Sequence, residues 1–303
     1  MTDALFITDV GPRDGLQSQS TMVSTEGKRA LIEALFDAGL RRIEATSFAS
    51  PKAVPQMADA DALIRGLVVP DDARVSVLVP NQRGLERAVE AGAREIAVVL
   101  AATETMNRKN IRMGLDQALQ TCRDTLTDAA RAGLRTRAYV AVAFACPFEG
   151  VTAEARVTEL ALEMRNAGAS EIVIADTIGS AAPTDVARVL DALLAHLPPD
   201  AVGVHFHDTR GMALANAWCA ITHGVRRFDA SIGGLGGCPF APGAAGNLAT
   251  EDLALMAQQC KLETGIDLQA LCAAIDIASE LVGYSVGGRS ERWLVRQQQR
   301  DGA

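Results

Sequence analysis

The chain has 303 residues, of which 49% are hydrophobic and 22% are charged, as is usual for a globular protein with a large core. Its formal net charge of −8 argues against general binding of nucleic acid and against docking on an anionic membrane, because both require a basic surface. The first residues carry no secretory signal, no apolar run reaches the roughly 18 residues of a membrane-spanning helix, and the six cysteines show no CxxC spacing. We therefore expect a cytoplasmic protein with reduced thiols.

One local pattern recurs along the chain. The segments DAGLRRIEA, EAGAREIAV, RAGLRTRAY, NAGASEIVI and THGVRRFDA each end a helical pattern at a glycine and then begin an apolar run. The glycines tolerate the left-handed conformation that often ends a helix, and they are Gly39, Gly92, Gly133, Gly168 and Gly224. The runs are short and rich in Val, Ile and Ala, which is typical of strands buried on both faces.

Eight strands are predicted in chain order, over 5–10, 41–47, 73–79, 94–101, 136–144, 171–176, 201–207 and 227–232. Amphipathic helical patterns separate them, for example over 25–38, 115–132, 153–167, 183–195 and 212–223. This strict alternation favours a closed (β/α)8 TIM barrel over a doubly wound open sheet. No linker divides the chain, so we expect one catalytic barrel domain over 1–285, with extra C-terminal helix, and a polar tail over 286–303.

In such a barrel the chemistry lies at the C-terminal ends of the strands. We expect polar side chains at these ends and apolar strand interiors. The candidates are Arg13-Asp14, Glu44-Thr46, Asn81, Thr103-Glu104, Asp176-Thr177, His205, His207, Asp208 and the glycine-rich loop after 232.

The turn VGPRDGLQ, residues 10–17, follows the first strand. Asp14 can supply an oxygen to a metal ion or move a proton, and Arg13 can stabilise negative charge that develops during a reaction. A surface ion pair between them is the alternative. Glu44 and Asp176, at the ends of the second and sixth strands, are each placed to pair with Arg13 or to transfer a proton.

His205 and His207 lie two apart on the seventh strand, so both side chains leave the same face. Two imidazoles and a carboxylate suit Mn²⁺, Co²⁺ or Zn²⁺, and Mg²⁺ if further oxygen ligands are added. A hydrogen-bonded histidine pair is the alternative. Asp208 points to the opposite face, which favours capping of a helix or support of the ligands.

The segment GGLGGCPFAPGAAGN, residues 233–247, predicts a loop of the kind that closes over a ligand as a lid. Cys238 lies at its centre, where closure would deliver a thiol to the reacting atoms. Asn247 ends the loop as either a helix cap or an oxygen ligand. Cys146 lies in no comparable loop, and we interpret it as structural.

Several long motifs resemble the 3-hydroxy-3-methylglutaryl-CoA lyase family: VGPRDGLQ, IEATSFASPKAVPQM, ADTIG, HFHDTRGMALAN and GLGGCPFAPGAAGNLATEDL. They run in order over about residues 5–285. A wider group that includes the isopropylmalate and homocitrate synthases shares the RDG turn and the HxH strand. The resemblance implies a divalent cation, Mg²⁺ or Mn²⁺, held by Asp14, His205, His207 and Asn247. It also implies retro-Claisen cleavage of an acyl-CoA to acetyl-CoA and acetoacetate, by an enzyme that we expect to be a homodimer.

The resemblance further implies a role for each remaining candidate. Asp14 or His205 removes the hydroxyl proton, Arg13 stabilises the enolate, and Cys238 protonates it. Positions that match the family's substrate site are Gln17, Glu44, Asp176, Arg210, Lys109 and Asn110.

Four positions depart from the family's pattern. Arg210 replaces a usual Tyr, Pro242 a Lys, Val173 a Ser and Ala175 a Gly. Because the predicted ligands are all present, the cleavage chemistry is expected to be kept. The alternatives are a related lyase for another 3-hydroxy-3-substituted acyl-CoA, such as a citramalyl or longer branched ester, and a synthase that condenses acetyl-CoA.

Overall fold

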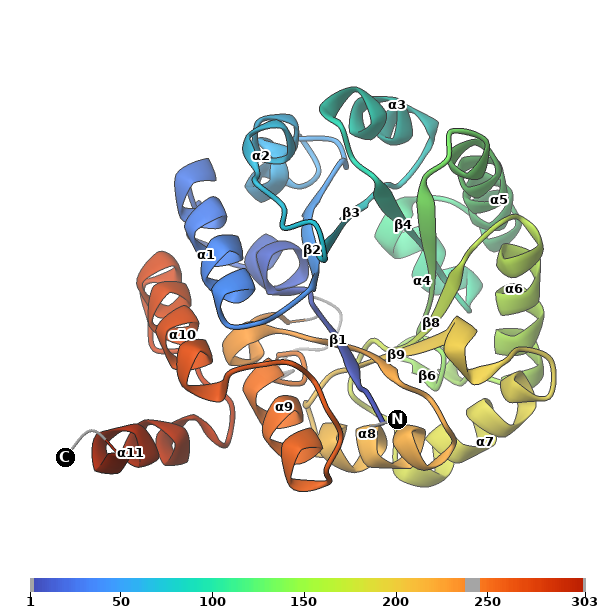
Figure 1. The fold of residues 1–303 in the computed structure, drawn as a ribbon. Helices are drawn as coiled ribbons and strands as arrows, with labels where there is room; N and C mark the ends of the chain where they lie inside the picture. Colours follow the sequence, from blue (N-terminus) through green and yellow to red (C-terminus); the bar gives the residue numbers. More distant parts are fainter. Residues whose placement is uncertain (1–2, 238–245, 302–303) are drawn as a thin grey trace.

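Eight parallel strands close into a barrel in the computed structural model, which describes residues 3–237 and 246–301 (Figure 1). The order around the barrel is β1-β10-β9-β8-β5-β4-β3-β2, and β2 pairs back with β1. The strands are β1 (Phe6–Asp9), β2 (Arg42–Ser47), β3 (Arg74–Leu78), β4 (Glu95–Ala101), β5 (Arg135–Ala141), β8 (Glu171–Asp176), β9 (Val202–Phe206) and β10 (Arg227–Ala230). All eight predicted strands and the TIM-barrel fold are confirmed.

Helices surround this barrel (Figure 1). They are α1 (Thr25–Asp37), α2 (Ala60–Gly66), α3 (Gln82–Ala91), α4 (Glu104–Ile111), α5 (Leu115–Arg131), α6 (Glu154–Asn166), α7 (Pro183–Leu194), α8 (Ala213–Thr222), α9 (Thr250–Gln259), α10 (Leu268–Val282) and α11 (Glu291–Asp301). A hairpin of β6 (Ala145–Cys146) and β7 (Gly150–Val151), which the sequence analysis did not predict, follows β5.

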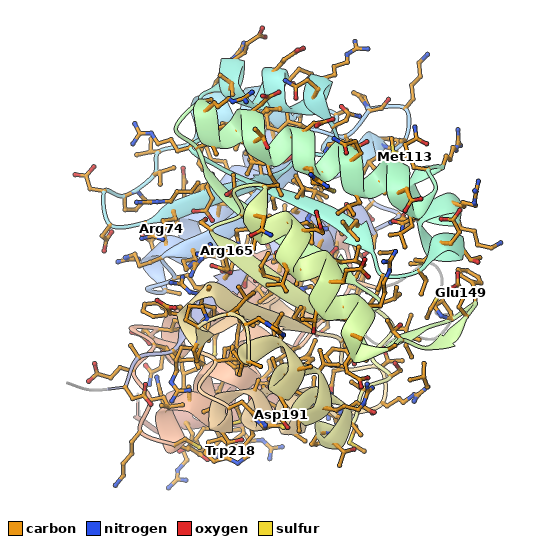
Figure 2. The ribbon with its side chains drawn as sticks, turned by 90° about the vertical axis from the view of Figure 1, so that its right-hand side faces the viewer. Arg74, Met113, Glu149, Arg165, Asp191 and Trp218 are labelled. Carbon is orange, nitrogen blue, oxygen red and sulfur yellow. The ribbon has the colours of Figure 1, made fainter. Side chains whose placement is uncertain are left out.

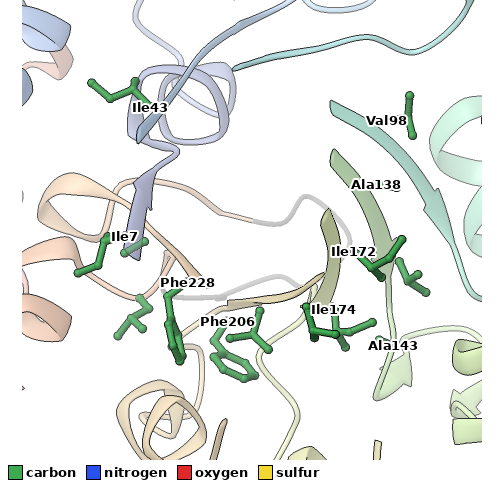
Figure 3. Close-up of a cluster of buried hydrophobic side chains, with 14 of the residues drawn as sticks. Ile7, Ile43, Val98, Ala138, Ala143, Ile172, Ile174, Phe206 and Phe228 are labelled. Carbon is green, nitrogen blue, oxygen red and sulfur yellow. The ribbon is translucent and has the colours of Figure 1, made fainter. Parts of the chain in front are cut away.

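The outer faces of the strands carry the main hydrophobic core. Ile7, Ile172, Ile174, Phe206 and Phe228 are each at most 4% exposed, and Figure 3 shows them directed from the strands toward the surrounding helices. Each such side chain contributes about 1.5–3 kcal/mol on burial. This apolar layer fixes the position of every strand end.

Charged and polar side chains lie on the inner faces of the strands. The expectation of apolar strand interiors is therefore wrong for this side of the barrel. Arg137 on β5 pairs with Glu171 on β8 at 2.8 Å, and Glu171 also pairs with Arg42 on β2 at 2.6 Å. Tyr139, Glu44 and Asp229 lie in the same interior, and all are buried. Successive side chains of a strand point to opposite faces of the sheet. The polar residues therefore face the barrel interior, and the aliphatic residues face the helices.

Figure 2 views the barrel from the side and separates its two ends. Arg74, at the start of β3, lies toward one end, whereas Met113 and Glu149, from segments that follow β4 and β5, lie toward the other. The loops that follow the strands therefore gather at one rim, as the (β/α)8 fold requires.

The C-terminal region is more ordered than a polar tail. Residues 291–301, part of the segment assigned to the tail, form α11, which packs against α10. The division into a barrel domain over 1–285 and a tail over 286–303 stays a prediction. No helix within the described residues is long and apolar enough to cross a membrane.

The five glycines of the recurring pattern all have positive φ, from 75° at Gly133 to 112° at Gly168, as predicted. Gly39 and Gly92 form a matched pair with φ of 91° and 94°. A Cβ at Gly39 would lie 2.2 Å from the carbonyl oxygen of Gly265, whereas a Cβ at Gly92 meets no described heavy atom within 4 Å.

We expect Gly92→Ala to lower the free energy of unfolding by about 1–2 kcal/mol, the cost of a left-handed conformation alone. Gly39→Ala should cost about 3 kcal/mol or more, because the clash with Gly265 adds to that cost. Urea unfolding of both variants measures the difference. Equal losses would show that the contact with the segment around Gly265 does not constrain Gly39.

Candidate active site

Three predicted ligands meet at the C-terminal rim of the barrel. One ligand atom each from Asp14, His205 and His207 lies within 4.8 Å of the others. Asp14 comes from η1 (Gly11–Gly15), a single π-helical turn directly after β1, whereas the histidines lie at the end of β9. Both imidazoles are buried, and their ring centroids are 5.0 Å apart. A carboxylate and two imidazoles in this arrangement can hold a divalent metal ion.

Asn247 joins this cluster through its side-chain amide. Its Nδ2 donates to Asp14 Oδ2 and to the Leu235 carbonyl oxygen, both at 2.9 Å. Its Oδ1 is buried and has no hydrogen-bond partner among the residues described. The alternative role as a helix cap does not apply, because the residue that caps α9 is Ala249. A buried amide oxygen without a partner is costly unless a cation or donor faces it, so Asn247 fits a metal site.

Hydrogen bonds fix the orientation of both imidazoles. His205 Nδ1 lies 3.3 Å from Asp229 Oδ2, and His207 Nδ1 lies 3.1 Å from the Asp176 carbonyl oxygen. These acceptors place a proton on each Nδ1, so the Nε2 of each ring keeps its lone pair. Partners of this kind are typical of metal-binding histidines.

The ionisation states of Asp14 and His207 also suit a cation. Burial and the nearby His205 lower the pKa of His207 to about 4, which keeps this imidazole neutral at pH 7. Burial disfavours the charged form of Asp14, but Arg13 and the two imidazoles outweigh it and lower the pKa of this carboxyl. For His205, the bond and charge of Asp229 outweigh burial and raise the pKa. Asp14 and His207 are thus in the forms that bind a metal ion, whereas a cation has to displace a proton from His205.

Arg13 borders the cluster and is itself buried. Its Nε donates to Glu44 Oε1, and its Nη1 donates to Asp14 Oδ1 at 2.6 Å. Gln17 Nε2 donates to the same Asp14 oxygen at 3.1 Å. Of the two acidic candidates for pairing with Arg13, the structure therefore selects Glu44. The two carboxylates raise the pKa of Arg13 against the effect of burial, so the guanidinium stays charged beside the cluster.

Asp176 does not pair with Arg13. Its carboxylate accepts from the backbone N–H groups of Ser180 at 2.9 Å and Ala181 at 3.0 Å. It therefore shapes the turn after β8, and only its carbonyl oxygen reaches the cluster, through His207.

The remaining substrate candidates lie farther out on the rim. Arg210 is exposed, donates to the Ser180 carbonyl oxygen at 3.3 Å, and lines a cavity of about 300 Å³ together with Phe144 and Ile178. Lys109 and Asn110 lie exposed on α4, where the ammonium of Lys109 is 4.9 Å from the centre of the Phe148 ring. The structure does not bring these three side chains into the metal cluster.

Cys238, the centre of the expected lid, lies outside the described residues, as does Pro242. The two ends of that loop lie together, since Asn247 Nδ2 donates to the Leu235 carbonyl oxygen at 2.9 Å and a Cβ at Gly246 would lie 1.8 Å from the Gly234 carbonyl oxygen. The Gly246 carbonyl oxygen also accepts from Asp208 N–H at 3.0 Å. Asp208 Oδ1 also accepts from Ala213 N–H at the start of α8, which agrees with the predicted capping of a helix rather than with support of the ligands. Cys146 is buried and accepts a hydrogen bond from Thr103, as a structural thiol would.

Sequence reasoning missed three polar residues beneath the cluster: Arg137, Tyr139 and Asp229. For Arg137 and Tyr139, the alternation in RTRAYVA, residues 135–141, was the available signal. It was uninformative without the closed barrel, because a strand with one solvent-facing side shows the same alternation.

We expect His207→Ala to weaken Mn²⁺ binding by more than about 100-fold, since it removes a ligand rather than a partner of one. His223→Ala is the control, because His223 ends α8 and bonds the Cys219 carbonyl oxygen. Isothermal titration of chelator-treated protein measures both affinities. Equal affinities of the two variants would exclude this cluster as the metal site.

Comparisons with known proteins agree with this geometry. The sequence model of the HMGL-like family matches residues 4–278. The hydroxymethylglutaryl-CoA lyase of Bacillus subtilis is 43% identical over 94% of this chain and 95% of its own length. The mitochondrial hydroxymethylglutaryl-CoA lyase of Bos taurus is 45% identical over 88% of this chain and 82% of its own. An HMG-CoA lyase from Acinetobacter baumannii, solved with coenzyme A and 3-methylmalate, superposes with a TM-score of 0.91 at 40% identity, over 96% of this chain and 95% of its own. The protein belongs to the HMGL-like family of carbon–carbon lyases.

Proposed function

We propose that this protein cleaves 3-hydroxy-3-methylglutaryl-CoA to acetyl-CoA and acetoacetate with the help of a divalent cation, Mg²⁺ or Mn²⁺. The observation that carries the proposal is the cluster of Asp14, His205 and His207 beside the buried guanidinium of Arg13. Next to it lies Oδ1 of Asn247, which has no hydrogen-bond partner among the described residues. The names of the relatives support the substrate. The coenzyme A in one of these structures supports an acyl-CoA partner.

Asp14, His205, His207 and Asn247 would hold the cation. When bound there, it supplies Lewis-acid chemistry that makes the tertiary hydroxyl of the substrate easier to deprotonate.

Asp14 is the better placed of the two proposed bases. If His205 uses Nε2 as a ligand, its Nδ1 is held by Asp229 and no nitrogen is left for a proton. Asp14 has two oxygens, of which one can act as a ligand while the other accepts the hydroxyl proton. As that proton leaves, the bond between C2 and C3 breaks, C3 becomes the ketone of acetoacetate, and the electron pair passes to the thioester fragment as an enolate.

Arg13 provides the positive charge that this enolate needs. Its Nε and Nη1 are held by Glu44 and Asp14, so the guanidinium is oriented before the reaction begins. Preorganised charge of this kind is among the largest contributions to catalysis. A proton from Cys238 to the enolate carbon completes acetyl-CoA. The assignment of Cys238 rests on the sequence, and a homodimer in the cytoplasm stays a prediction.

We expect purified protein to release acetyl-CoA and acetoacetate from 3-hydroxy-3-methylglutaryl-CoA when Mg²⁺ or Mn²⁺ is present, and to lose this activity after chelation. Citramalyl-CoA and a longer branched 3-hydroxyacyl-CoA test the related lyases. Acetyl-CoA with a 2-oxoacid tests the condensing synthase. Turnover of another ester without turnover of 3-hydroxy-3-methylglutaryl-CoA would overturn the assigned substrate.

Cys238→Ala should lower kcat by about 10²- to 10⁴-fold, the usual contribution of a positioned proton donor. Its affinity for Mn²⁺ should not change, because the thiol is not among the proposed ligands. Cys260→Ala, at an exposed cysteine, is the matched control and should keep full activity. A Cys238→Ala variant with the rate of the control would show that the loop thiol does not donate the proton.

A further inference from the structure

The barrel interior beneath the metal cluster holds a set of side chains with no role in the proposed chemistry. Arg137, Tyr139 and Asp229 are 2%, 4% and 2% exposed. Branched apolar side chains usually fill this space in a TIM barrel. Buried ion pairs are often no more stabilising than apolar residues of the same volume, so stability alone is a weak reason for these residues. Instead, these residues contact side chains that orient His205 and Arg13 in the proposed active site.

Asp229 is held on both oxygens. Oδ1 accepts from Arg137 Nη2 at 2.6 Å, and Oδ2 accepts from the Tyr139 hydroxyl at 2.6 Å. The same Oδ2 lies 3.3 Å from Nδ1 of His205. With both oxygens fixed from below, the carboxylate has one orientation, and so has the ring of His205 above it.

Tyr139 connects these contacts with Glu44, the carboxylate that pairs with Arg13. Its hydroxyl accepts from Arg137 Nη1 at 2.9 Å, and its single proton is shared between Asp229 Oδ2 at 2.6 Å and Glu44 Oε2 at 3.2 Å. The other oxygen of Glu44, Oε1, accepts from Arg13. One phenol therefore lies between the carboxylate that orients His205 and the carboxylate that orients Arg13.

We infer that Tyr139 and Asp229, anchored by Arg137, are positioning residues that fix the spacing between the cation held by His205 and the guanidinium of Arg13. Neither residue is among the proposed ligands, bases or proton donors, and both act through His205 and Arg13. The catalytic part of this inference rests on the proposed function, whereas the part that concerns metal affinity does not.

Two conservative variants test the inference. Asp229→Asn keeps the shape of the side chain but removes the charge that orients His205, and it should weaken Mn²⁺ binding by about 10- to 100-fold, as loss of a ligand's partner does. Tyr139→Phe keeps the ring but removes the contact with Glu44. It should lower kcat by roughly 10- to 100-fold, because small displacements of a catalytic group cost that much, while KM changes less than about twofold.

The control is Tyr284→Phe, the same chemical change at an exposed tyrosine that donates to Gln19. Mn²⁺ titration, kcat, KM and thermal unfolding are measured for each variant. Asp229→Asn and Tyr139→Phe with the Mn²⁺ affinity and kcat of the control would overturn the inference. If Asp229→Asn does not fold, the kcat of Tyr139→Phe decides.

If wild-type protein cleaves no 3-hydroxy-3-methylglutaryl-CoA, the proposed function fails, and the Mn²⁺ affinity of Asp229→Asn still tests the role of Asp229.

Discussion

An ionised group inside the barrel must be paired, and this constraint organises the whole site. Arg137 makes the central pairing, because its guanidinium forms ion pairs with both Glu171 and Asp229. From Asp229 the contacts pass to His205, and from Tyr139 to Glu44 and Arg13. These residues come from different strands, so the pairing requires a closed barrel, and the apolar layer outside the strands supplies the free energy that closes it.

The requirement that buried charges be paired also explains the hydrogen bonds of Asp14. Its Oδ1 faces the donors of Arg13 and Gln17, and its Oδ2 faces the amide of Asn247, from a residue 233 positions later in the chain. One carboxylate thus joins the turn after β1 to the end of the glycine-rich loop. Because Arg13 is already shared with Glu44, a negative charge remains available to a cation at this point. Oδ1 of Asn247, which no hydrogen-bond donor in the described part of the chain reaches, also needs a cation or a donor.

Most of the rim could be predicted from the sequence, and the interior could not. The glycine pattern defined where helices end, and strict alternation then located the eight strands and the polar residues that follow them. Side-chain direction was not available, which is why Glu44 and Asp176 looked equivalent although only Glu44 reaches Arg13. The polar residues of β5 were missed for another reason. Charged side chains at every second position usually face solvent, and only closure of the sheet places Arg137 and Tyr139 inside.

Arg210 stands where the family usually has Tyr, and the geometry of the rim keeps this difference away from the metal ligands. Its guanidinium turns to the Ser180 carbonyl oxygen, on the turn that Asp176 holds, and does not enter the cluster of ligands. The cavity that it lines with Phe144 and Ile178 belongs to the loops after β5 and β8. Those loops can vary without moving the strands, because the strands are fixed by the apolar layer outside and by the charge pairs inside. A change at Arg210 therefore alters the wall of this cavity, while the metal ligands and Arg13 stay in place.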